Sequence, residues 1–315
     1  MLAAASACLP MAALAQAGGP GPIRLVVPFA AGGSVDVLAR LMAPHLSERL
    51  HQDVVVENRT GAAGAIAAEN VVQSPANGTS LLVASGGQVT IAAALPQNLS
   101  FDPMRDLVPV THLVDTPYIF SAGPSLRQPG LLEMIADTKA RPDSITYASP
   151  GAGSVTHLMM EILNQETGAR FLHVPYRGTG QAMADLMSGR VDMTLGSVAS
   201  VKPALDRREL RAVATAGHVR LAQFPDVPTT SELGIPGMDV RVWIGLVTRA
   251  GTPAPTIARI DEAVRAVMAL PELRARLEPL ILIPVSDGPA AFGVTLAEDA
   301  ARWKRVVARG NITLN

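Results

Sequence analysis

The clearest pattern near the start of the chain is a short apolar run that leads through a glycine loop into a helix. Residues 23–27 (IRLVV) are almost all apolar and rich in β-branched side chains, which predicts a buried strand. Gly32 and Gly33 permit a positive φ or a close approach by another group. Ser34 can cap the following helix, and Asp36 lies in its first turn. Strand, loop and helix start together suit a bound anion, although an ordinary strand-to-helix turn explains the same pattern.

The rest of the chain alternates between strand and helix patterns, beginning in the order β-α-β-α-β. Further strands are expected at residues 53–57, 80–84, 108–113, 118–121, 144–148, 171–174, 191–195 and 210–215, with an extended run from 239. Helices are expected at residues 37–50, 64–73 and 130–140, after 154, up to 187, and at 255–269, 272–278 and 289–309. This alternation is typical of α/β proteins whose parallel strands are joined by crossover helices.

The chain length predicts two domains, and the pattern suggests where they divide. We expect the chain to cross between two α/β lobes near Thr116 and again near Val240, with the C-terminal helices returning to the first lobe. The first lobe then holds residues 18–116 and 241–315, and the second holds residues 117–240. A discontinuous layout of this kind forms a hinge and a cleft.

A second glycine loop, residues 149–154 (SPGAGS), repeats the arrangement of the first. Both loops follow a strand and open a helix, and so does the shorter loop at 85–87. Ligands of such sheets bind beyond the carboxyl ends of the strands. Two helix N-termini from different lobes, facing one cleft, would suit a ligand with a carboxylate at one or both ends.

Composition argues against several classes of partner and cofactor. The 315-residue chain has 26 basic and 27 acidic residues and no basic tract, so nucleic acid and anionic membranes are not expected partners. Thr156 stands where a dinucleotide fingerprint needs its third glycine, and no P-loop motif occurs. The six histidines are scattered, without zinc-ligand spacing. We therefore predict neither a cofactor nor a metal.

The first 17 residues indicate export. Residues 1–17 carry no charge, are rich in Ala and Leu, and end in Ala15-Gln16-Ala17, a signal-peptidase pattern. The segment is too short to span a bilayer, which takes about 20 apolar residues. A lipoprotein signal at Cys8 is a weaker alternative. Cleavage after Ala17 removes this single cysteine, so disulfides and thiol chemistry are not expected. We predict an exported protein.

Four side chains in or beside these loops allow more than one interpretation. Ser154 and His157 could form the nucleophile and base of a hydrolase, but the G-x-S-x-G elbow is missing and His157 can equally pack within its helix. Arg177 could pair with a carboxylate or simply lie at the surface. Asp36 could contact a ligand or only cap its helix.

Taken together, the motifs resemble one family: the periplasmic solute-binding receptors of the tripartite tricarboxylate transporter type, also called Bug or TctC-type proteins. The matching segments are VPFAAGGSVD (27–36), VVVENRTGAAG (54–64), SFDPMRDLVPVT (100–111), YASPGAGSVTHL (147–158), HVPYRG (173–178), GRVDM (189–193) and WIGLVTRAGTP (243–253). The resemblance implies a two-lobed periplasmic binding protein of type II, or Venus flytrap. Each lobe would be a mostly parallel sheet flanked by helices, with the ligand in the cleft between the lobes.

The resemblance also implies which residues hold the ligand. Backbone amides, hydroxyls and ordered water from the glycine loops would bind its carboxylate. The candidates are Phe29, Ala30, Gly33, Ser34, Asp36, Ser85, Gly86, Ser149, Gly151, Gly153, Ser154, His157, Tyr176, Arg177, Gly196 and Ser197. Family members often carry an Asp at the position of Gly196, where it can select an amino-bearing ligand. Its absence argues against an amino acid and leaves Ser197 as a neutral contact.

The predicted function is that of a non-enzymatic receptor. It would capture a small carboxylate, such as a di- or tricarboxylate, and deliver it as a monomer to membrane subunits of a tripartite tricarboxylate transporter. Two alternatives stay open from the sequence: an exported hydrolase that uses Ser154 and His157, and a ligand-sensing receptor that docks on a signalling protein.

Overall fold

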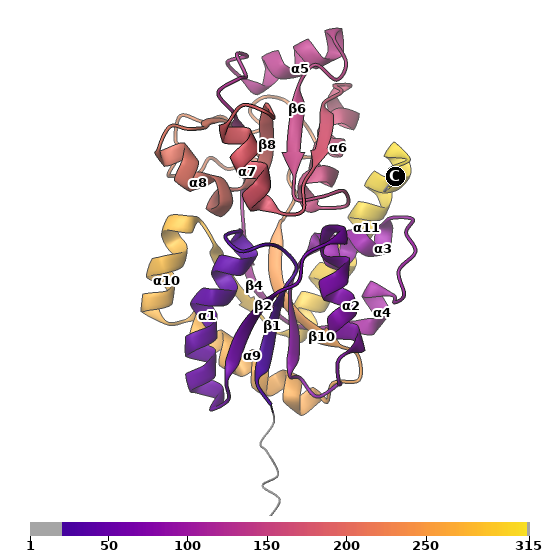
Figure 1. Ribbon diagram of the computed structural model, residues 1–315, viewed down its shortest axis with the longest axis vertical. Helices are drawn as coiled ribbons and strands as arrows, with labels where there is room; N and C mark the ends of the chain where they lie inside the picture. Colours follow the sequence, from indigo (N-terminus) through magenta and orange to yellow (C-terminus); the bar gives the residue numbers. More distant parts are fainter. Residues whose placement is uncertain (1–20, 314–315) are drawn as a thin grey trace, which may run out of the picture.

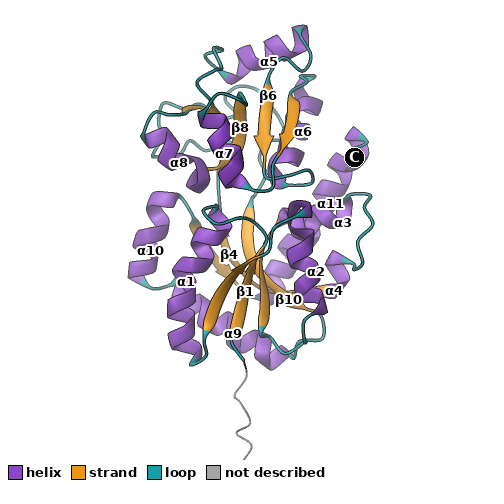
Figure 2. Ribbon diagram, viewed as in Figure 1, coloured by secondary structure: helices purple, strands orange, loops and turns teal. Residues whose placement is uncertain are grey.

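A computed structural model describes residues 21–313 as two α/β lobes stacked along the long axis of the molecule (Figure 1). The predicted signal segment and Cys8 lie outside the described residues. The α/β class and the two lobes are confirmed, with helices on both faces of each sheet (Figure 2). No helix between residues 21 and 313 is long and apolar enough to cross a membrane.

The first lobe is built on a six-stranded sheet in the order β11-β4-β10-β3-β1-β2. Its strands are β1 (Ile23–Val27), β2 (Val54–Asn58), β3 (Ser80–Ser85), β4 (Leu107–Asp115), β10 (Trp243–Arg249) and β11 (Ile283–Asp287). Around it lie α1 (Ser34–Leu50), η1 (Ala62–Gly64), α2 (Ala65–Gln73), η2 (Gly86–Gln88), α3 (Thr90–Ala94), α4 (Pro103–Asp106), α9 (Ala254–Met268), α10 (Pro271–Leu277), η3 (Glu278–Leu280) and α11 (Pro289–Gly310).

The second lobe is built on a five-stranded sheet in the order β7-β6-β8-β5-β9. Its strands are β5 (Tyr118–Ala122), β6 (Thr146–Ser149), β7 (Leu172–Pro175), β8 (Met193–Ser197) and β9 (Arg211–Thr215). Its helices are α5 (Leu131–Ala140), α6 (Val155–Thr167), α7 (Thr179–Met187) and α8 (Val198–Asp206).

Most strands in each sheet run in one direction, as predicted. In the first sheet β1 pairs in parallel with β2 and β3, and only β10 and β11 run against the others. In the second sheet β6 is parallel to β7 and β8, and only β5 runs in the opposite sense. The carboxyl ends of β1, β3, β6 and β8 therefore face the junction between the lobes.

Alternation along β1 divides its side chains between two cores. Ile23, Leu25 and Val27 are buried against α1 and α9, whereas Val26 faces the opposite core with α2. A strand buried on both faces needs apolar residues at nearly every position, which accounts for the sequence IRLVV.

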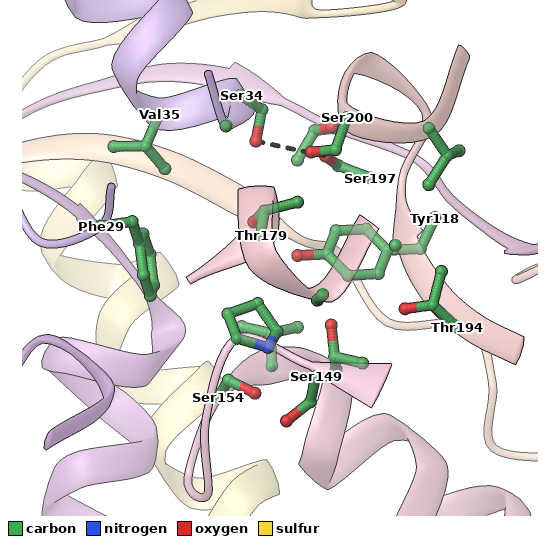
Figure 3. Close-up of a pocket in the computed structure, with 18 of the residues that line it drawn as sticks. Phe29, Ser34, Val35, Tyr118, Ser149, Ser154, Thr179, Thr194, Ser197 and Ser200 are labelled. Atoms are coloured by element: carbon green, nitrogen blue, oxygen red, sulfur yellow. Dashed lines mark hydrogen bonds between the residues drawn. The ribbon is translucent and has the colours of Figure 1, made fainter. Parts of the chain in front are cut away.

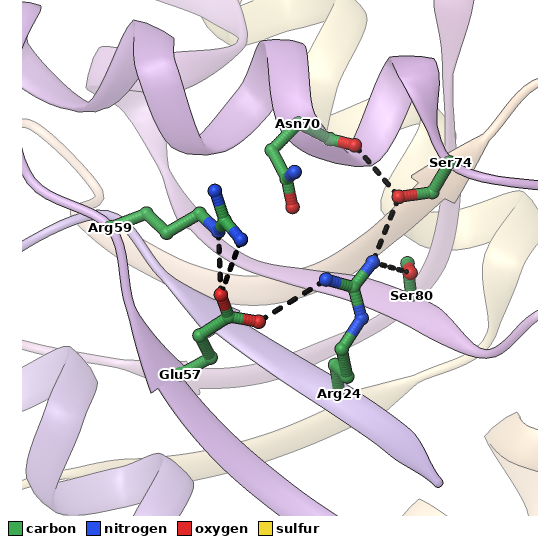
Figure 4. Close-up of polar contacts among 6 residues, drawn as sticks. All are labelled: Arg24, Glu57, Arg59, Asn70, Ser74 and Ser80. Atoms are coloured by element: carbon green, nitrogen blue, oxygen red, sulfur yellow. Dashed lines mark hydrogen bonds and ion pairs between the residues drawn. The ribbon is translucent and has the colours of Figure 1, made fainter. Parts of the chain in front are cut away.

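Arg24 is the polar exception in β1, and its side chain ties α2 to the sheet (Figure 4). Its guanidinium pairs with Glu57 of β2 at 3.2 Å and donates to Ser74 at 3.0 Å and Ser80 at 2.6 Å. Glu57 also pairs with Arg59 at 2.6 Å. Partial burial makes these bonds stronger than those of an exposed ion pair.

The two segments that cross between the lobes run side by side. The backbone N–H of Thr116 donates to the carbonyl of Val242 at 2.8 Å, close to both predicted crossings. Helix α11 also reaches both lobes, because it begins against the first sheet while Trp303 and Val307 pack with Met159 of α6. The C-terminal helix thus contacts the second lobe as well as the first.

The short helices α3 and α4, helix α8 and strand β11 were not predicted from the sequence, and the last two carry a proline. Helix α8 follows β8 without an intervening loop and contains Pro203, a residue that normally ends a helix. Strand β11 is an irregular edge strand that contains Pro284, and its register against β4 shifts after that residue. Both elements carry residues that argue against them locally, and tertiary packing decides their conformation.

Candidate functional site

A cavity of about 60 Å³ lies between the lobes (Figure 3). Both lobes line it: Phe29, Ser34 and Ser85 from the first, and Ser149, Ser154 and Ser197 from the second. One water needs roughly 10–15 Å³ by the same kind of measure, so this inner cavity suits a ligand of a few atoms' width.

The N-termini of α1 and α6 meet at the inner cavity. Ser34 and Val35, the first residues of α1, line it from one lobe, and Val155 and Thr156 of α6 line it from the other. The first N–H groups of a helix have no partner within the helix, and its dipole places partial positive charge there. The two helix starts therefore supply donors and positive potential from opposite sides.

The start of α1 differs in detail from the sequence analysis. The N-cap residue is Gly33, with a φ of −77°, and only Gly32, at +95°, needs the freedom of glycine. Ser34 was expected to cap the helix, but it is the first helical residue. Its hydroxyl faces the cavity and accepts a hydrogen bond from Ser197 of the other lobe at 3.2 Å.

Asp36 supports this loop, and it is not among the residues that line the inner cavity, so the structure favours the helix-cap alternative over a direct ligand contact. Its buried carboxylate accepts hydrogen bonds from the Gly32 N–H at 3.0 Å, the Asn58 amide at 2.8 Å and Arg40 at 3.0 Å. Burial alone would raise the pKa of Asp36, but these hydrogen bonds outweigh it and leave the pKa below its ordinary value.

Nearly half of the residues that line the cavity carry a hydroxyl, and among residues 21–313 no charged side chain lines it. Eleven of the 23 lining residues carry a hydroxyl: Ser34, Ser85, Thr116, Tyr118, Ser149, Ser154, Thr156, Thr179, Thr194, Ser197 and Ser200. Gly196 also lines the wall, where an added Cβ would lie 3.1 Å from Val201. Electrostatic attraction for an anion must therefore come from backbone dipoles and hydroxyls.

Several candidates lie around a second cavity of about 420 Å³, which is more open to the surface. Gly151, Gly153, Tyr176 and Arg177 line this outer cavity, and Phe29 lines both. The Tyr176 hydroxyl donates to Asp185 at 3.0 Å, and Arg177 is exposed. Neither residue lines the inner cavity, and their predicted contact with the ligand stays a prediction.

Three other candidates line neither cavity. Ala30 packs against Gly178, since a Cβ on that glycine would lie 3.2 Å from Ala30. Gly86 faces Thr90 and Asp299 beneath the loop. The third, His157, is buried in α6.

The contacts of His157 do not form a hydrolase dyad. Its ring Nδ1 accepts a hydrogen bond from the backbone N–H of Gly153 at 3.1 Å. The backbone N–H of His157 donates to the Ser154 hydroxyl at 3.4 Å, so Ser154 caps the helix. The ring stacks on His173 at 4.3 Å, and burial lowers the pKa of His157 to about 4. Within residues 21–313 no hydrogen bond joins the Ser154 hydroxyl to the His157 ring. His157 supports the glycine loop from behind.

The sequence analysis missed six hydroxyl residues of the wall: Thr116, Tyr118, Thr156, Thr179, Thr194 and Ser200. Thr116 and Tyr118 flank the first crossing between lobes, and Thr179 opens α7 just after the motif HVPYRG. The predicted crossing between the lobes could have pointed to Thr116 and Tyr118, and the motif before α7 could have pointed to Thr179. Among the described residues, no group of three or more His, Cys, Asp or Glu side chains could hold a metal ion.

Two α/β lobes that enclose a small cavity, with helix N-termini aimed into it, define a solute-binding protein. The family model described as "Tripartite tricarboxylate transporter family receptor" matches residues 38–312. Protein BugT of Bordetella pertussis is 34% identical over 292 residues, which cover 91% of this chain and 88% of BugT. The chain belongs to this receptor family.

Solved structures of related binding proteins have the same fold as this chain. "R. palustris Rpa4515 with adipate" is 30% identical, with a TM-score of 0.88 and coverage of 94% of this chain and 99% of that chain. MatC from Rhodopseudomonas palustris with bound malate is 33% identical, with a TM-score of 0.86 and coverage of 91% and 98%. "Structure of periplasmic binding protein BugD" is 28% identical, with a TM-score of 0.87 and coverage of 93% and 98%.

Proposed function

We propose that this receptor binds a small di- or tricarboxylate in the inner cavity and delivers it, outside the cytoplasm, to a tripartite tricarboxylate transporter. The observation that carries the proposal is the meeting of two helix N-termini at one uncharged, hydroxyl-lined cavity. The lobes of such a receptor close around the ligand, with residues 117–240 moving against the rest. The relatives solved with adipate and malate support an acid as ligand.

The polar groups of the wall form two poles. Ser34, Ser197 and Ser200 gather at the start of α1, and Ser149 and Ser154 gather at the start of α6 (Figure 3). Each pole offers hydroxyl and backbone donors to one carboxylate. A ligand with two carboxylates can therefore bind both lobes at once and favour the closed arrangement.

The wall offers little to an amino acid. An ammonium group needs acceptors and is best held by a carboxylate, but no Asp or Glu side chain lines the cavity. Burying a charge without a partner is costly. We therefore expect discrimination against ligands that carry an amino group.

Isothermal titration calorimetry with two variants tests the binding site. Ser197→Asp places a negative charge beside Ser34, whereas Ser197→Asn is close to it in size and neutral. Two like charges about 4 Å apart repel by roughly 4 kcal/mol at the effective dielectric of a protein surface. We expect Ser197→Asp to abolish binding of dicarboxylates such as malate and adipate, and Ser197→Asn to retain part of it. Equal affinities of the two variants would contradict the proposed site.

Uptake measurements test delivery to a transporter. Cells that carry the cognate membrane subunits but lack this receptor should take up labelled ligand only when the purified receptor is added to their spheroplasts. Binding without any effect on uptake would leave the receptor function and reject the delivery step.

A further inference from the structure

We infer that the ligand carries at least one hydroxyl group on the carbon chain between its carboxylates. This inference rests on the proposed function and narrows it to hydroxy acids. It comes from Thr116, Tyr118 and Thr179, three hydroxyl residues of the inner cavity that stand apart from the two carboxylate poles.

Thr116 gives the strongest indication. The residue is only 3% exposed, and its hydroxyl has no hydrogen-bond partner within the described structure. Its backbone N–H is bonded to Val242, which fixes the residue at the crossing between the lobes. Buried hydroxyls are nearly always hydrogen-bonded, so a rotation of the Thr116 side chain toward the cavity that this residue lines would let a ligand supply the missing partner.

Tyr118 adds a second polar group at the centre of the cavity. Its phenol oxygen points into the space between the two serine poles (Figure 3). Burial raises the pKa of Tyr118, while a hydrogen bond with Thr156 acts in the opposite sense, so the phenol stays protonated at neutral pH. A phenol both donates and accepts, and one protein partner leaves it able to bind a second group.

Thr179 faces the same region from α7. Its Oγ1 lies 3.6 Å from the position that a Cβ on Gly33 would take, so it sits directly between the lobes. Thr116 and Tyr118 come from the first crossing segment and Thr179 from the start of α7, so two separate segments of the chain bring these hydroxyl residues to the cavity.

The chemistry of these groups selects a hydroxyl. A plain methylene chain would leave them without partners, and an unsatisfied buried polar group costs binding affinity. An ammonium would find no carboxylate among the lining residues. A ligand hydroxyl can donate to one of these side chains and accept from another.

Calorimetry with matched acid pairs tests the inference. The probes are succinate and malate, glutarate and 2-hydroxyglutarate, and adipate and 2-hydroxyadipate, so that chain length and hydroxylation are varied separately. We expect the hydroxy acid of the best-fitting length to bind about 10- to 100-fold more tightly than its unsubstituted partner.

Single substitutions show which residues produce the preference for the hydroxy acid. Thr116→Val and Tyr118→Phe each remove one hydroxyl with little change of shape. Each should reduce the preference for the hydroxy acid by about fivefold or more while sparing the unsubstituted acid. Two controls lose buried, unpartnered hydroxyls that lie outside the cavity wall, Thr215→Val and Tyr147→Phe, and should keep the preference. Circular dichroism checks that each variant folds.

The outcomes separate the inference from the proposed function. Equal binding of the hydroxylated and unsubstituted acids overturns the inference and leaves a carboxylate receptor. A preference that survives both cavity variants also overturns it. If no acid binds at any length, the proposed function itself fails.

Discussion

Asp36 provides the sharpest prediction about how the ligand loop is held. Its carboxylate is 2% exposed and fixes the loop through Gly32, while Asn58 bonds both to Asp36 and to the Phe29 carbonyl. Asp36→Ala removes the acceptor for two neutral donors and for Arg40. Because Asp36 does not line the cavity, any loss of ligand affinity must come from the loosened loop.

The magnitude follows from the three bonds. A hydrogen bond to a charged group contributes about 1.5–3 kcal/mol when protected, but Arg40 is half exposed and contributes well under ~1 kcal/mol. We expect Asp36→Ala to lower the free energy of unfolding by about 2–4 kcal/mol. The matched control is Asp206→Ala, which breaks an exposed i,i+4 pair with Lys202 and should cost roughly 0.5 kcal/mol or less.

Urea unfolding at pH 7 measures the loss of stability. Calorimetric titration with a dicarboxylate that the wild type binds measures the loss of affinity. The affinity of Asp36→Ala should fall by about tenfold or more, while that of Asp206→Ala stays at the wild-type value. Because the pKa of Asp36 is lowered in the folded state, its stabilisation is present above the ordinary value of 3.8 and fades as the pH falls below it. The stability gap between wild type and Asp36→Asn should therefore narrow in acid. A loss no larger than that of Asp206→Ala at pH 7 would refute the reasoning.

Two further predictions concern packing and acid stability. A Cβ at Gly245 would overlap the ring of Phe292, so Gly245→Ala should lower the unfolding free energy by about 1–3 kcal/mol, whereas helical Gly293→Ala, with only an ordinary contact, should be neutral or stabilising. If urea unfolding showed Gly245→Ala to be more stable than Gly293→Ala, the sheet and Phe292 would have to shift enough to make room for the added methyl group. Burial lowers the pKa of His157 to about 4 and that of the stacked His173 to about 3, so the unfolded chain binds two extra protons as the pH falls from 6.5 toward 4, and each ring lowers the stability by up to about 1.4 kcal/mol per pH unit in that window. His157→Gln should reduce this slope by about half, and His218→Gln, at an exposed site, should leave it unchanged; equal slopes in all three proteins would contradict the assignment.

The sequence predicted the parts of the fold whose signals are local. Strand β1 follows from its run of apolar residues, and the starts of α1 and α6 follow from glycine loops before a helical pattern. The matching glycine loops before α1 and α6 also predicted that the N-termini of these two helices face one cavity. Elements fixed by tertiary packing were missed, as with α8, where Pro203 argues against a helix and the surrounding core overrides it.

The site was predicted in outline for the same reason. Half of the sixteen candidate residues line the inner cavity, because loops at strand ends converge there: Phe29, Gly33, Ser34, Ser85, Ser149, Ser154, Gly196 and Ser197. The direction of a side chain is not encoded locally. Asp36 turns back to its own loop, and Arg177 turns outward to the second cavity. Thr116 belongs to no motif, and its one sequence signal was its place at the predicted crossing between the lobes.

The central claim is that backbone donors at two helix starts bind the ligand without a charged side chain. An NMR titration of the 15N-labelled protein with malate or adipate tests it most directly, because it reports on each backbone N–H. We expect the largest amide shifts at Val35 of α1 and at Val155 and Thr156 of α6. These shifts should saturate together at one ligand per chain. Binding that leaves these amides unmoved and shifts instead those around Arg177 would contradict it.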